Sequence, residues 1–91
     1  MAAQVRDNRE EGRFELEVEA GTAIAAYRLS DDRIVFTHTE VPQELEGQGV
    51  ASRLVEGALE MVRAEGLKVV PACSFVRGYI ERHPDMQDLL A

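Results

Sequence analysis

The segment from Val41 to Ser52 leads from a predicted strand into a predicted helix, and it constrains the fold of this chain most strongly. Residues 34–41 are rich in β-branched and aromatic side chains, as strands are. After the segment, apolar side chains recur at helical spacing, at Ala51, Leu54, Val55, Ala58, Leu59 and Val62. Gly47 and Gly49 lie where this helix should begin. Because the first N–H groups of a helix have no partner inside it, the turn predicts a phosphate-binding site.

A tight turn without a ligand is the alternative interpretation, since glycines are also used where only the backbone requires them. The dinucleotide-binding fingerprint is excluded, because Ser52 rather than glycine stands three positions after Gly49. The phosphate loop of nucleotide hydrolases is excluded too, because no Gly-Lys-Ser or Gly-Lys-Thr follows. A pyrophosphate group remains compatible with the turn.

An antiparallel meander is predicted upstream, because short turns join three strand-like segments. These segments cover residues 13–19, 22–29 and about 33–41. In the first of them Phe14, Leu16 and Val18 share one face, and four charged side chains share the other, which is typical of a half-buried strand. Residues 1–12 have little apolar content, and we expect them to be a loosely ordered lead-in to a single domain over residues 13–91.

A strand–helix–strand crossover is predicted downstream. The helix should run from about Gln48 to Glu65 and end at Gly66, with Gly57 allowing it to pack closely on the sheet. A short buried strand follows over residues 67–71, and a crossover of this length makes it parallel to the strand before the helix. A second helix over residues 73–82 and a final turn over residues 84–90 complete an α/β (α+β) chain.

The composition excludes several classes of function. Ninety-one residues make one small domain, and no apolar run approaches the roughly twenty residues that span a bilayer. The net charge is −7 and the ten basic residues are scattered, so we expect no nucleic-acid partner. An acidic surface favours a cationic substrate, although it also serves solubility alone. One cysteine and no signal-peptide pattern at the N-terminus make a cytoplasmic protein the expectation.

Four motifs in order carry a family resemblance. They are His38-Thr39-Glu40-Val41-Pro42, residues 44–49, Val69-Val70-Pro71 followed by Cys73, and residues 79–84. Together they resemble the very small single-domain branch of the GCN5-related N-acetyltransferase superfamily, over roughly residues 13 to 90. The acyl-CoA loop of that superfamily reads Gln/Arg-x-x-Gly-x-Gly/Ala. Gly49 and Ala51 match it, whereas Glu46 stands where Gln or Arg is usual.

The resemblance implies a minimal acyl-CoA N-acyltransferase fold that binds acetyl-CoA between two splayed strands. The pantetheine arm of coenzyme A would follow the third strand, and the pyrophosphate would meet the start of the helix. The implied cofactor-binding residues are Thr39, Glu40, Val41, Gly47, Gln48, Gly49, Val50, Ala51 and Ser52. For Glu46 we expect a side chain that turns away from the phosphates.

Four residues are candidates for the chemistry of acyl transfer. Tyr79 is the candidate acid by family position, although an aromatic ring packed on the sheet is the alternative. Cys73, near a helix start, is a candidate acetyl acceptor or pocket-lining residue, although free cysteines are commonly buried for packing. His38 could act as its partner or as a base, and Glu40 could deprotonate an amine through water. These residues are too few for a persuasive zinc site.

The predicted function is therefore transfer of an acetyl group from acetyl-CoA to an amine by direct attack in a ternary complex. The acceptor would be a small molecule or a peptide, with no membrane partner, and the protein a monomer or weak homodimer. A CoA-binding module without turnover and an interaction domain without a cofactor are the alternatives.

Overall fold

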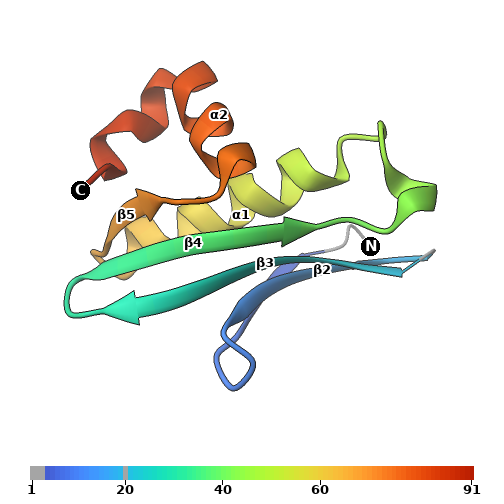
Figure 1. Cartoon of the computed structure of the whole chain (residues 1–91), viewed down its shortest axis with the longest axis horizontal. Coiled ribbons are helices and arrows are strands. Elements are labelled where there is room, and N and C mark those ends of the chain that lie inside the picture. Colours follow the sequence, from blue (N-terminus) through green and yellow to red (C-terminus); the bar gives the residue numbers. More distant parts are fainter. Residues whose placement is uncertain (1–3, 20) are drawn as a thin grey trace.

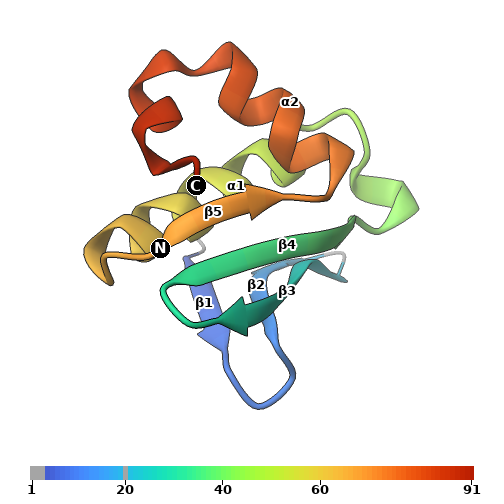
Figure 2. The same cartoon turned by 60° about the vertical axis from the view of Figure 1, so that its left-hand side comes forward.

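A computed structural model describes residues 4–19 and 21–91 of the chain. A five-stranded sheet forms its base, with the strands side by side in chain order (Figures 1 and 2). The strands are β1 (Val5–Asn8), β2 (Arg13–Val18), β3 (Gly21–Ser30), β4 (Arg33–Glu40) and β5 (Lys68–Pro71). The first four pair antiparallel, and β5 pairs parallel with β4. Both the predicted meander and the parallel crossover are confirmed.

Helix α1 (Val50–Ala64) connects β4 to β5 and packs on the sheet (Figure 1). Its buried side chains are Val50, Leu54, Val55, Ala58, Leu59 and Val62, which are the predicted periodic positions with Val50 in place of Ala51. A Cβ atom on Gly57 would lie 2.4 Å from Cγ2 of Val5 in β1. The predicted role of Gly57, close packing of the helix on the sheet, is therefore confirmed.

Helix α2 (Ser74–Arg82) packs beside α1 and against β4 and β5, and a 3-10 helix, η2 (Pro84–Leu89), follows it. Arg63 of α1 fixes this last segment, because its guanidinium donates to the carboxylate of Asp88 at 2.6 Å and to the carbonyl of Asp85 at 2.8 Å. The chain end then bridges to β5 through Leu90 and Val69. No helix in the described residues is long and apolar enough to cross a membrane.

Strand β1 corrects the expectation of a loosely ordered lead-in over residues 1–12. Residues 5–8 pair with residues 13–16 of β2, while residues 1–3 lie outside the described part of the chain. Only one side chain of this strand, Val5, is apolar. The strand is held by its main-chain ladder with β2, by Val5 packed against the core, and by Asp7, which accepts hydrogen bonds from Tyr27 and Arg9.

Glu15 also departs from its expected environment. It projects from the polar face of β2, as the alternation predicts, yet the residue is only 4% exposed. Arg6, Asn8 and Arg13 surround its carboxylate and donate hydrogen bonds to it. The hydrogen bonds from Arg6, Arg13 and Asn8 lower the pKa of Glu15 to about 2.

Candidate functional site

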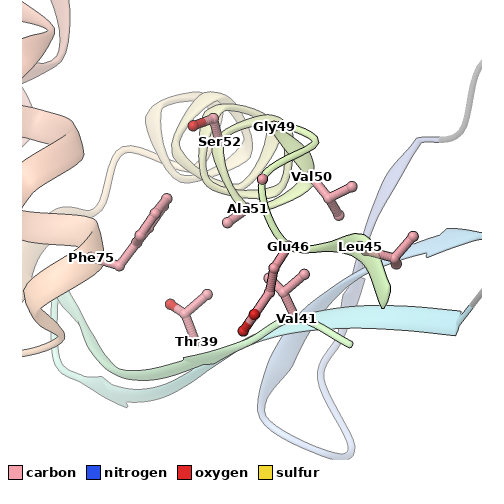
Figure 3. Close-up of a pocket in the computed structure, with 10 residues that line it drawn as sticks. Thr39, Val41, Leu45, Glu46, Gly49, Val50, Ala51, Ser52 and Phe75 are labelled. Atoms are coloured by element: carbon pink, nitrogen blue, oxygen red, sulfur yellow. The ribbon is translucent and has the colours of Figure 1, made fainter. Parts of the chain in front are cut away.

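A pocket of about 460 Å³ opens where β4 ends and α1 begins (Figure 3). Four parts of the chain form it: the end of β4, the loop after it, the first turn of α1 and the start of α2. The residues lining it are Thr39, Val41, Leu45, Glu46, Gly47, Gly49, Val50, Ala51, Ser52 and Phe75. Seven of the predicted cofactor-binding residues therefore share one pocket. Gln48 and Glu40 do not line it.

The loop into α1 has the backbone geometry of an anion cradle. A single turn of 3-10 helix, η1 (Gln43–Leu45), precedes it, and Gly47 and Gly49 then adopt left-handed conformations with φ of 80° and 76°. Such angles are costly for residues with a Cβ atom. No side chain caps α1, so its first N–H groups stay available to a ligand. The helix begins at Val50, two residues later than expected, because Gly49 serves as its left-handed N-cap.

Strands β4 and β5 separate beside this loop. Their pairing runs only from Arg33 with Lys68 to Phe36 with Pro71, after which the Cys73 N–H donates to the Phe36 carbonyl at 2.8 Å. Beyond that point residues 37–40 continue β4 without a partner in β5. The side of β4 toward β5 is thus a free edge that can accept an extended ligand.

A β-bulge at Thr37 decides which side chains of β4 face the pocket. In the pairing with β3, Phe36 lies opposite Tyr27 and His38 opposite Ala26, so Thr37 has no partner. The extra residue reverses the alternation of the strand. Phe36 faces the core, and after the bulge Thr39 does so, opposite the buried Ala25.

Cys73 lies next to the pocket wall and contacts Thr39. Its sulfur is 3.3 Å from the Thr39 hydroxyl, and the residue is 9% exposed. Burial raises the pKa of the Cys73 thiol, but the hydrogen bond with Thr39 and the nearby N–H groups of Val76 and Phe75 outweigh this and leave the pKa below its usual value.

His38 and Glu40 are not brought to Cys73. Because of the bulge they point to the other face of the sheet, where the His38 Nε2 lies 3.3 Å from a Glu40 carboxylate oxygen. Their side chains are 58% and 64% exposed. The predicted sharing of one face by these two residues is correct, but that face is not the face of the pocket.

Tyr79 is buried in α2 and does not line the pocket. Its ring stacks on that of His83 with centroids 3.9 Å apart, and the His83 Nδ1 lies 2.7 Å from the Tyr79 carbonyl oxygen. Burial and the negative charges of Glu56, Asp85 and Glu60 raise the pKa of the Tyr79 hydroxyl. The hydroxyl therefore keeps its proton at neutral pH, as an acid must, but the pocket is not beside it.

For Glu46, the expectation that its side chain turns away from the phosphates stays a prediction. The residue lines the pocket, and Figure 3 shows its carboxylate reaching from the loop toward β4. Leu45 and Phe75 are two further lining residues that were not among the implied cofactor-binding residues. Glu46 was indicated only by its place in the acyl-CoA motif, where Gln or Arg is usual, and Phe75 lies in the helix just after Cys73.

The fold and the pocket define a class of protein. A family model described as GCN5-related N-acetyl-transferase matches residues 13–89, which include every strand from β2 onward and the whole pocket. The chain belongs to this family, and its mixed α/β architecture is that of the family's fold.

Individual relatives support the assignment. The protein NATD1 of Gallus gallus and that of Mus musculus are each 36% identical over 63 residues, which cover 68% of this chain and 57% of the relative. The matched part is thus little more than half of these relatives. The solution structure of a GCN5-like protein from Staphylococcus aureus superposes with a TM-score of 0.73 at 31% identity, covering 97% of this chain and 87% of that one.

Proposed function

We propose that this protein binds acetyl-CoA in the pocket and transfers the acetyl group to an amine. The main observation behind the proposal is that the uncapped start of α1 and the free edge of β4 line the same pocket. Membership of an N-acetyltransferase family supports it. The net charge of −7 favours an acceptor that is cationic before it loses its proton.

The pocket fits coenzyme A in two respects and opposes it in one. The N–H groups of residues 50–52 are available for the pyrophosphate, and a Cβ atom at Gly47 or Gly49 would meet nothing within 4 Å, so the approach to the backbone is open. The backbone of Thr39 to Val41 is available for the amide groups of the pantetheine arm. The carboxylate of Glu46 opposes an anionic ligand and is the one feature that weakens the fit.

Direct transfer needs little from the protein beyond positioning. A bond forms between the amine nitrogen and the acetyl carbon, the bond from that carbon to sulfur breaks, the amine loses a proton and the leaving thiolate gains one. Among the residues lining the pocket, Glu46 has the only ionisable side chain. We infer that water carries the amine proton away, and that Thr39 and Cys73 shape the site around the thioester. Tyr79 remains an acid candidate by family position alone.

Isothermal titration with coenzyme A and acetyl-CoA tests the binding step. We expect saturable binding of both ligands, and no detectable heat with either one would contradict the proposal. Turnover is tested by release of the CoA thiol over a panel of small amines and basic peptides. Thiol release that depends on an added amine supports transfer.

A CoA-binding module without turnover is the second candidate. The scarcity of ionisable groups in the pocket favours it, since acid–base catalysis has few side chains to use there. Tight binding of acetyl-CoA with no thiol release over the whole amine panel would support this second function.

A further inference from the structure

Two sides of the pocket are chemically unlike. One side is the loop and first turn of α1, where residues 47–52 offer backbone N–H groups. Beside the first turn of α1 lies Phe75, the only aromatic side chain among the lining residues, with Thr39 near it. Figure 3 shows Phe75 projecting from α2 toward the first turn of α1, with Leu45 at the opposite side of the pocket. An anionic group suits the backbone N–H groups of residues 47–52, whereas an apolar group suits the side of the pocket at Phe75.

The free edge of β4 also ends near Phe75. The gap between β4 and β5 closes where the Cys73 N–H donates to the Phe36 carbonyl. Phe75 follows two residues later in the first turn of α2. A ligand arm that runs along residues 39–41 toward this point has little room beyond it, because the hydrogen bond between Cys73 and Phe36 connects the two segments there.

Packing holds the Phe75 ring in place. The residue is partly buried and packs against the hydrophobic core, so the ring is supported from behind while one side faces the pocket. A supported aromatic ring is a firm wall, because moving it would open space in a close-packed interior. Glu46 and Ser52 elsewhere on the pocket are exposed and offer no such wall.

We propose that Phe75 limits the length of the acyl chain, so that the donor is acetyl-CoA or another short acyl-CoA. The inference rests on the proposed function, since it concerns what that pocket accepts. A longer chain would have to displace the supported ring, which loses packing contacts that the added methylene groups do not restore, so the longer ligand binds more weakly.

The test uses S-alkyl thioethers of coenzyme A, which cannot transfer an acyl group, with chains of two, four and six carbons. Affinity is measured by titration calorimetry, with coenzyme A itself in parallel. For the natural sequence we expect the six-carbon thioether to bind at least about tenfold more weakly than the two-carbon one. In Phe75→Ala the difference should shrink to about threefold or less, because the chain can enter the space of the ring.

Two further variants show whether the effect belongs to this ring. Phe75→Leu keeps an apolar wall and should retain most of the discrimination. Val41→Ala enlarges the pocket on its β4 side and should leave the ratio unchanged. Thermal unfolding of each variant confirms that the protein remains folded.

The outcomes separate the inference from the proposed function. Equal affinity for all three chain lengths in the natural sequence contradicts the inference alone, as does a ratio unaltered by Phe75→Ala or altered equally by Val41→Ala. Failure of coenzyme A and every thioether to bind contradicts the proposed function, and the inference with it.

Discussion

The Thr39 hydroxyl lies 3.3 Å from the Cys73 sulfur, joining the end of β4 to the start of α2 beside the pocket. The two residues are 34 positions apart in the chain. The contact depends on the bulge at Thr37, which turns Thr39 toward α2 and His38 away from it. A histidine, the usual partner for a reactive thiol, is thus replaced at this position by a hydroxyl that cannot act as a base at neutral pH.

Thr39→Val should make the Cys73 thiol less acidic. Valine keeps the shape of threonine but cannot donate a hydrogen bond to the sulfur, so one of the causes that lower the pKa is lost. We expect the rate of alkylation by iodoacetamide, measured against pH, to reach its midpoint at a higher pH than in the natural sequence. His38→Ala is the control and should not move the midpoint. An unchanged profile in Thr39→Val would show that the hydroxyl does not stabilise the thiolate.

Cys73→Ser should retain most of the acetyl transfer if the amine attacks acetyl-CoA directly. Serine keeps a small polar side chain beside Thr39, whereas it cannot form the same thioester intermediate. Activity is measured by thiol release, and mass spectrometry follows incubation of the natural sequence with acetyl-CoA alone. A single acetyl group on Cys73 that forms as fast as turnover, together with loss of activity in Cys73→Ser, would establish a covalent route instead.

Gly49→Val should abolish binding of coenzyme A while the protein stays folded. The side chain would point into open space in the pocket, where the pyrophosphate is expected to approach. Gly66→Val is a matched control, because Gly66 has a φ of 73° and equally open surroundings just beyond the other end of α1. Both variants should lose about 1–2 kcal/mol or more of stability from backbone strain. Equal affinity of the two folded variants would refute the role of the loop.

Glu46→Gln should tighten binding of coenzyme A by about threefold to tenfold at low ionic strength, since it removes a negative charge from the wall of an anion-binding pocket. The gain should shrink as salt is added, because screening weakens the repulsion. Glu44→Gln, on η1 just before and outside this pocket, should change affinity less. Titrations at two salt concentrations measure both effects. No gain at low salt would mean that the carboxylate does not act on the cofactor.

Glu15 should make stability depend on pH in the acid range. Its folded pKa of about 2 lies below the value of about 4.3 expected in an unfolded chain. The ionised form is thus favoured by folding, and its stabilising contribution is complete above about pH 4.3 and is lost as the pH falls toward 2. In urea unfolding, Glu15→Gln should lose less stability over this range than the natural sequence. Glu19→Gln, an exposed carboxylate just past β2, should follow the natural profile.

Most of the fold could be predicted because hydrophobic spacing determines it. Strands β2 to β5 and both helices follow from apolar side chains that recur at intervals suited to each element. Strand β1 could not be found in this way, since polar contacts and a main-chain ladder hold it. Its one apolar residue is explained only by Gly57, 52 positions later, whose missing side chain makes room for Val5.

The site was predicted in part for a related reason. The glycine turn is a local feature, so Gly47 and Gly49 indicated their own conformations. The side chains of β4 that face the pocket were harder to predict. Simple alternation through residues 34–40 would turn His38 and Glu40 toward the core with Phe36. The bulge breaks that alternation, and no residue type in the strand predicts the bulge. Phe75 could not be assigned to the pocket without knowing where α2 packs.

The single unpaired residue at Thr37 puts the two halves of β4 out of phase. If Thr37 instead paired with Ala26 in a regular ladder, His38 would replace Thr39 opposite Ala25 at the pocket and Glu40 would turn inward. The register that the bulge sets between β3 and β4 therefore selects a hydroxyl rather than an imidazole as the group beside Cys73. In a relative without the extra residue, matching positions by sequence number alone would equate side chains that lie on opposite faces of the sheet.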